Sequence, residues 1–150
     1  MFIKIALLFC IFFIFITIFN KCCENSEKYQ REQFTHYPIL SRLKKQCSLL
    51  DNRVGNLDFL YSRDETYTDN KKKIYICLLN KDGRYYDFNT LMFVCIHEIS
   101  HAISAEFDPE HTSKEFNDNF ALLLNKAIDM NLYDPSKVMP PEYCGIKMKN

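Results

Sequence analysis

Glycine and an excess of charge of either sign are what this sequence lacks. It has only three glycines in 150 residues, too few for a glycine-rich loop that cradles a phosphate. Its 19 basic side chains are balanced by 19 acidic ones, so no polycationic surface for nucleic acid is expected. We therefore predict neither a phosphate-binding loop nor a nucleic-acid partner.

Closely spaced cysteine pairs are missing as well. The seven cysteines form no C-x-x-C motif, which argues against a zinc site built from thiolates. Cys77 and Cys95 lie in apolar runs, where a free thiol behaves as a small hydrophobic side chain. A disulfide between Cys47 and Cys144 is a pairing that the sequence leaves open.

At its N-terminus the sequence has a long apolar run. Residues 2–19 hold a single charged side chain, Lys4, and a single hydroxyl, Thr17. Eighteen helical residues rise about 27 Å, close to the thickness of about 30 Å of the hydrocarbon core of a bilayer. We predict a transmembrane anchor in residues 1–20 that contacts the membrane through residues 2–19.

A cleaved signal peptide is the alternative for this segment. A cleavage site needs small residues, whereas the apolar run ends with Ile18 and Phe19. Lys and Arg are more frequent after the run than before it, which favours a single-pass protein whose C-terminal domain is cytoplasmic. Residues 21–37 are polar, and we interpret them as a tether or as the first turns of a helix.

Residues 38–150 predict one α+β domain. Apolar residues recur at helical spacing in several segments, and one short run is rich in strand-forming residues. Turn signals lie between these segments. The predicted elements are a helix that opens at Pro38, a strand over residues 74–79, a helix from Leu91 capped by Asn89 or Thr90, a helix behind the capping box Thr112-Ser113-Lys114-Glu115, and an irregular tail from Asp134.

The pattern that points to chemistry is His97-Glu98-Ile99-Ser100-His101. A helix turns about 100° per residue, so residues four apart share one face, and two imidazoles there can bind a single cation. Met92, Ile96, Ile99 and Ile103 recur on the opposite side, which predicts a helix with one face in the core. Glu98 lies beside the histidine face, where it can contact water rather than the metal. The pattern is typical of a zinc hydrolase.

A catalytic zinc ion has three protein ligands and one position for water. His97 and His101 supply two ligands. We predict His111 as the third, because it precedes the next helix and can turn back toward the first. His36 is remote in sequence and is not expected to contribute. We expect one Zn²⁺ per chain, and the acidic side chains that compete with His111 for the third position are Glu106, Asp108, Glu110 and Glu115.

These residues predict hydrolysis of a peptide bond. Zinc lowers the pKa of a bound water toward about 7, and Glu98 would accept its proton as the water attacks the peptide carbonyl. Tyr143 is a candidate donor to the developing oxyanion, with a packed C-terminal tyrosine as the alternative. The strand over residues 74–79 is a candidate for pairing with an extended peptide or protein substrate.

Segment 89–101, together with His111-Thr112-Ser113-Lys114-Glu115-Phe116, resembles the WLM/SprT-like zincin metallopeptidases. The chain resembles in particular small membrane-anchored members from large DNA viruses, which also have a segment like Tyr143-Cys144-Gly145. The resemblance covers roughly residues 74–145. It implies a zincin-like fold with an HExxH helix and a small sheet, one zinc ion on the three histidines, Glu98 as the catalytic base, and a host or virion membrane as the location.

We therefore predict a membrane-anchored zinc metalloprotease. The alternative is a non-catalytic zinc-binding membrane protein with a structural or adaptor role. Glu98 distinguishes the two functions, because only the enzyme needs a base beside the metal.

Overall fold

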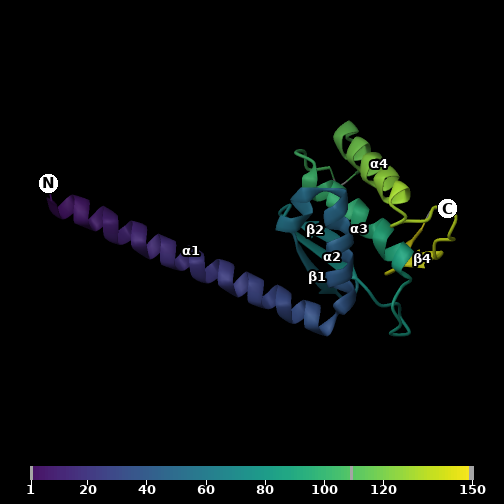
Figure 1. Ribbon diagram of the computed structural model, residues 1–150, viewed down its shortest axis with the longest axis horizontal. Coiled ribbons are helices and arrows are strands. Elements are labelled where there is room, and N and C mark those ends of the chain that lie inside the picture. The colour runs from purple at the N-terminus through teal and green to yellow at the C-terminus, as the bar shows by residue number, and fades with distance from the viewer. Residues whose placement is uncertain (1, 109, 149–150) are drawn as a thin grey trace.

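The computed structural model describes residues 2–108 and 110–148, apart from the side chains of residues 2–10, 23 and 26. Helices and strands mix in an α+β arrangement, as predicted. Helix α1 (Phe2–His36) extends away from a body that the other elements form (Figure 1). These elements are α2 (Pro38–Leu50), the 3-10 helix η1 (Asn52–Asn56), β1 (Asp58–Ser62), β2 (Tyr67–Asp69), β3 (Lys73–Cys77), α3 (Phe88–Ile103), α4 (Lys114–Asp129), β4 (Glu142–Tyr143) and β5 (Ile146–Lys147).

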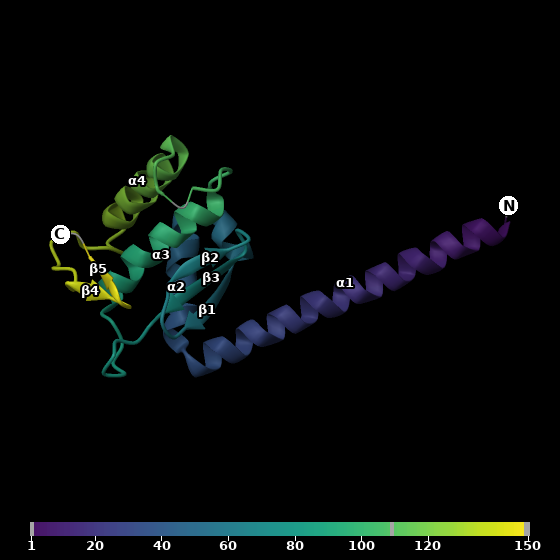
Figure 2. The ribbon, with the colours of Figure 1, turned by 180° about the vertical axis from the view of Figure 1, so that it is seen from behind.

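A three-stranded sheet lies beside helices α2 and α3 (Figure 2). Its strand order is β1-β3-β2, with β1 parallel and β2 antiparallel to β3. Phe59, Ile74 and Ile76 bring fully buried side chains from the strands into the core. The strand predicted over residues 74–79 is confirmed in its first part, since β3 ends at Cys77. Because β3 is central, β2 is an edge strand of this sheet.

Helix α3 begins three residues earlier than predicted, because Asp87 caps it in place of Asn89 or Thr90. The Asp87 carboxylate accepts hydrogen bonds from the backbone amides of Asn89 at 2.9 Å and Thr90 at 3.1 Å. The Asn89 side chain instead accepts from the backbone amide of Asp134 at 2.7 Å and donates to its carbonyl at 3.0 Å. The predicted cap is therefore wrong, and Asn89 ties the start of α3 to the C-terminal tail.

The helix predicted at Pro38 is confirmed as α2, and α4 begins just after Ser113. The Ser113 hydroxyl accepts a hydrogen bond from the backbone amide of Phe116 at 3.2 Å, so Ser113 rather than Thr112 is the N-cap. Capping of this kind stabilises the first turn of a helix by satisfying an unpaired amide.

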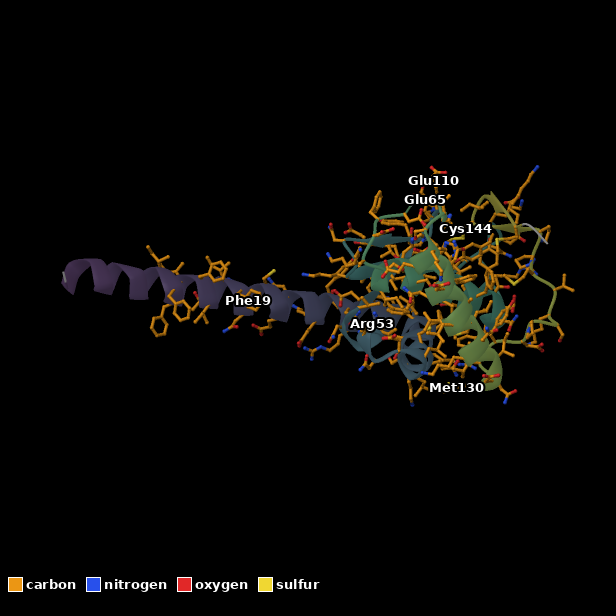
Figure 3. The ribbon with its side chains drawn as sticks, turned by 90° about the horizontal axis from the view of Figure 1, so that it is seen from above. Phe19, Arg53, Glu65, Glu110, Met130 and Cys144 are labelled. Atoms are coloured by element: carbon orange, nitrogen blue, oxygen red, sulfur yellow. A yellow bond between two sulfur atoms is a disulfide. The ribbon has the colours of Figure 1, made fainter. Side chains whose placement is uncertain are left out.

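The predicted transmembrane anchor is wrong. Within the described part of the chain, no helix is both long enough and apolar enough to cross a bilayer. Phe19, on the described part of α1, has an exposed side chain (Figure 3). The side chains of residues 2–10, the first half of the predicted anchor, lie outside the described residues. The single-pass membrane location predicted from this run is corrected with it. Residues 21–36 belong to α1, and Tyr37 leads into α2, so this segment is helical, the second of the two predicted possibilities.

The tail beyond Asp134 is not irregular throughout, because β4 pairs with β5 in a small antiparallel hairpin. A disulfide joins Cys144, in the turn of this hairpin, to Cys77 at the end of β3 (Figure 3). The Cys47–Cys144 pairing that the sequence left open does not form, since Cys47 is a buried free thiol in α2. The disulfide therefore holds the C-terminal hairpin against the sheet.

Candidate metal centre

Helix α3 presents two histidines on one face and hydrophobic side chains on the other. Met92, Ile96 and Ile99 are fully buried in the core, as predicted. His97 and His101, one turn apart, are only half-buried. Burial of the apolar stripe determines the rotation of the helix about its axis, and this directs both imidazoles toward the same side.

A third imidazole reaches the same point from the loop before α4. Nε2 of His111 lies 3.1 Å from Nε2 of His97 and 2.9 Å from Nε2 of His101. Three nitrogen ligands about 2.1 Å from a tetrahedral ion are separated by about 3.4 Å, only slightly more than these distances. The three histidines could therefore hold a metal ion. His36, exposed at the end of α1, does not join them.

Hydrogen bonding among the imidazoles cannot account for this convergence. Each imidazole nitrogen carries either one hydrogen or one lone pair, so it forms one good hydrogen bond. Nε2 of His111 has two nitrogen neighbours within 3.1 Å and can bond to only one of them. A cation placed among the three nitrogens would accept all three lone pairs at once, so the donor set fits a metal ion.

A tight reversal of the chain positions His111. Its backbone is in the left-handed region, with φ at 57°, which is uncommon for a residue with a side chain. The Asp108 carboxylate accepts hydrogen bonds from the backbone amides of Thr112 at 3.1 Å and Ser113 at 2.7 Å. The Asn117 side chain donates to the His111 carbonyl at 3.1 Å. These polar contacts stabilise the turn on both sides of the third imidazole.

The beginning of the same loop is tied to neighbouring elements. The Glu115 carboxylate accepts hydrogen bonds from the backbone amide of Ala105 at 2.9 Å and from that of Glu106 at 3.3 Å. Lys71, in the turn after β2, donates to the carbonyl groups of Ser104 and Ala105. Glu115 thus stabilises the loop, and the capping-box role predicted for it is replaced by this contact.

Burial and mutual repulsion keep the histidines of α3 neutral. Burial, together with the nearby His101 and His111, lowers the pKa of His97 to about 4. Burial and His111 also lower the pKa of His101, against a small opposing effect of Asp108. Phe116 stacks on the His101 ring with 4.3 Å between ring centroids. Neutral imidazoles are the form that binds a metal, so the site is prepared for one at neutral pH.

Glu98 is a buried acid beside the histidines. Only 7% of its surface is exposed, and burial raises its pKa to about 7. The Thr68 hydroxyl, on β2, lies 2.8 Å from its Oε2 and 2.8 Å from its backbone carbonyl oxygen. Thr68 was not predicted, because thirty residues separate the two and no local pattern links them. The alternation of Thr66, Tyr67 and Thr68 is the only sequence signal that such a strand exists.

The three histidines and Glu98 open into a cleft of about 760 Å³. One wall is the edge strand β2 with its flanking residues, from Thr66 to Lys71. Phe107 and Ile146 contribute apolar side chains from the loop after α3 and from β5. A second cavity, of about 1080 Å³, lies beside the Cys77–Cys144 disulfide and contains none of the histidines. The cleft at the histidines is therefore where a substrate could meet a bound metal.

Tyr143 does not line this cleft. It is buried, and its hydroxyl donates to the Cys77 carbonyl at 2.6 Å and lies 2.9 Å from the Thr66 hydroxyl. Burial raises the pKa of its phenol well above the usual range. The structure therefore places Tyr143 as a packed residue of the hairpin, which was the alternative to its predicted role as an oxyanion donor.

The acidic residues that competed with His111 are placed away from the cluster of nitrogens. Asp108 and Glu115 are engaged with backbone amides, which lower the pKa of both carboxyl groups. Glu106 lines the cleft and Glu110 is exposed on the loop. Neither belongs to the group of ligand atoms that could hold an ion among the described residues.

The chain is similar to uncharacterized proteins of viruses. It is 39% identical to one from Invertebrate iridescent virus 6 over 101 residues, which are 65% of this chain and 55% of that protein. It is 42% identical to one from Invertebrate iridescent virus 3 over 96 residues, which are 63% of this chain and 58% of that protein. A protein of Acanthamoeba polyphaga mimivirus is 33% identical over 141 residues, or 86% of this chain and 66% of that protein.

The chain thus spans between 55% and 66% of the length of these relatives. No protein-family profile matches it. No solved structure matches it either. The geometry of the cleft is therefore the main indication of a function.

Proposed function

We propose that this chain is a zinc-dependent metallopeptidase with a zincin-type site, related to the WLM/SprT-like enzymes that its metal motif resembles. One observation carries the proposal: three imidazole nitrogens converge beside a buried carboxylate in an open cleft. In this proposal His97, His101 and His111 hold one Zn²⁺ per chain, and Glu98 is the general base.

Zinc is the metal that this donor set favours. Three imidazoles at tetrahedral spacing leave one position open, which is the arrangement of catalytic zinc sites. When bound there, zinc would supply Lewis-acid polarisation of a water molecule and of a peptide carbonyl. Oxygen-preferring ions such as Mg²⁺ and Ca²⁺ are disfavoured, because among the described residues no carboxylate joins the cluster.

Glu98 is suited to move a proton near neutral pH. A base works best when its pKa lies near the working pH, and burial brings the pKa of Glu98 to about 7. Within the described chain no hydrogen bond reaches its second oxygen, Oε1, while Oε2 contacts Thr68. In the proposed reaction Glu98 accepts a proton from a water molecule in the cleft and donates it to the departing amine.

Strand β2 is the surface on which a peptide substrate would lie. It is the edge strand of the sheet and forms a wall of the cleft, so its unpaired backbone groups can pair with an extended chain. The central strand β3 has neighbours on both sides, which corrects the prediction that residues 74–79 pair with substrate. Pairing along β2 would carry the scissile bond past the three histidines.

The variant Glu98→Gln tests the proposal in the full chain loaded with zinc. We expect it to retain one zinc per chain and to lose peptidase activity about 10²- to 10⁴-fold, the usual contribution of a general base. Zinc content is measured by elemental analysis and activity with a mixed peptide library. Glu110→Gln is the matched control, because Glu110 is an exposed carboxylate of the adjacent loop outside the cleft.

Three results would contradict the proposal. If the wild-type chain binds no zinc, the metal assignment fails. If it binds zinc but cleaves no peptide, the non-catalytic zinc-binding role becomes the better account, and if it cleaves peptides and Glu98→Gln is equally active, Glu98 is not the base.

A further inference from the structure

Strand β2 directs a threonine toward the helix that carries the histidines. Side chains alternate along a strand, so Tyr67 is exposed and stacks on Tyr75 while Thr68 turns inward. Thr68 is partly buried at the wall of the cleft. The same strand therefore offers its backbone edge to the cleft and its Thr68 side chain to α3.

The Thr68 hydroxyl holds the Glu98 carboxylate in place by a hydrogen bond. Its Oγ1 lies 2.8 Å from Oε2 of Glu98 and 2.8 Å from the Glu98 carbonyl oxygen. Within the described part of the chain no other group hydrogen-bonds to this carboxylate. A glutamate side chain has three rotatable bonds, so a single hydrogen bond decides which orientation a largely buried carboxylate keeps.

A hydroxyl is suited to this position for a chemical reason. It has one hydrogen to donate and two lone pairs with which to accept. It can therefore donate to a carboxylate, or accept from a carboxylic acid while it donates to the helix carbonyl. Valine has the same shape but offers neither interaction.

We propose that Thr68 is a positioning residue that holds the Glu98 carboxylate over the cleft and links its orientation to strand β2. This inference rests on the proposed function of Glu98 as a base. Strand β2 is also the strand that would pair with a peptide. A substrate that orders this strand would therefore also order Thr68, which holds the Glu98 carboxylate. The residue thus couples substrate pairing to catalysis without touching the reacting atoms.

The test compares Thr68→Val with Thr68→Ser in the full chain. Valine removes the hydrogen bond and keeps the β-branched shape, whereas serine keeps the hydroxyl. Thr35→Val is the matched control, because the Thr35 hydroxyl also donates to a backbone carbonyl, that of Arg31 at 2.9 Å, but lies in α1 outside the cleft. Thermal unfolding of each variant shows whether the domain remains intact.

The first measurement is independent of turnover. Crystal structures of the two variants should show the Glu98 carboxylate displaced in Thr68→Val and retained in Thr68→Ser. An unmoved carboxylate in Thr68→Val overturns the proposal, whatever the activity of the protein.

The second measurement is kinetic. We expect Thr68→Val to lower kcat about 10- to 100-fold, as loss of a residue that orients an active-site group does, with little change in KM or in zinc content. Thr68→Ser should restore most of kcat, and Thr35→Val should match the wild type. A displaced carboxylate with unchanged kcat overturns the coupling to catalysis. If the zinc-loaded wild type has no peptidase activity, the proposed function fails instead, and the position of Glu98 in the crystal structures still decides whether Thr68 holds it.

Discussion

Two stretches of chain supply the three imidazoles, and different forces hold them. Helix α3 positions His97 and His101 by burying Met92, Ile96 and Ile99 on its opposite side. The loop between α3 and α4 positions His111 by hydrogen bonds to Asp108 and Asn117. Burying one such apolar side chain contributes roughly 1.5–3 kcal/mol, whereas one hydrogen bond contributes about 0.5–1.5 kcal/mol.

The site therefore has two parts: a firm half, which is His97 and His101 on α3, and an adjustable half, which is His111 on the loop. The pair on α3 moves only if the core moves. His111 keeps a left-handed backbone that its polar neighbours must stabilise. Perturbing the loop should therefore weaken metal binding by degrees, while perturbing the pair on α3 should abolish it.

The largest effect is expected when the pair itself is broken. In His97→Ala we expect zinc affinity to fall by more than about 100-fold, beyond the range for residues that only support a ligand. His111→Ala should cost less, because the two preorganised imidazoles of α3 remain. Competition titration with a zinc-binding dye measures both. An equal loss of zinc affinity in the two variants, or a larger loss in His111→Ala, would contradict the distinction between the firm and the adjustable half.

The pH dependence of the free energy of unfolding should reflect the titration of His97 on α3. The pKa of His97 is lowered to about 4 in the folded chain and is near 6.5 when unfolded, so folding favours the neutral form. This contribution is complete above pH 6.5 and is lost as the pH falls from there through 4, at a cost on the order of 3 kcal/mol. Urea unfolding of the metal-free protein at pH 7 and at pH 4 measures it. In His97→Gln the difference in unfolding free energy between pH 7 and pH 4 should be smaller. An unchanged difference would show that another group causes it.

A smaller effect is expected from Asp108→Asn. The substitution replaces one of the two acceptor oxygens that hold the amides of Thr112 and Ser113 with a donor. Zinc affinity should fall about 10-fold, at the lower end for a residue that orients a ligand, with little change in the thermal midpoint of the metal-free protein. Asp82→Asn, in an exposed turn away from the cleft, is the control and should match the wild type.

The smallest effect is expected from Asn117→Ala, which removes one hydrogen bond to the His111 carbonyl. A loss of about 0.5–1 kcal/mol corresponds to a two- to five-fold weaker zinc affinity. Hydrogen exchange of the backbone amides around His111 should quicken in this variant. If exchange is unchanged, the loop owes its shape to Asp108 alone.

The sequence predicts the firm half of the site better than the adjustable half. His97 and His101 follow from helical spacing, which is a local property, and His111 was predicted from its place before a helix. The interactions of Thr68 and Glu115 depend on tertiary contacts across thirty and ten residues, so no local pattern reveals them.

Two further predictions differ from the structure. The Cys77–Cys144 bond joins residues 67 apart, and pairings at such separations depend on the fold. The apolar run at the N-terminus predicts a membrane span, but no described helix is both long enough and apolar enough to cross a bilayer.

The bond between Cys77 and Cys144 also affects how the molecule must be handled at the bench. It borders a cavity of about 1080 Å³, wide enough to admit a small reducing agent. Dithiothreitol would open this crosslink by exchange and, as a dithiolate, would also compete for zinc. Buffers free of thiols and chelators would preserve the disulfide and any metal on the histidines, so an inactive preparation stored in reductant would not count against the proposed activity.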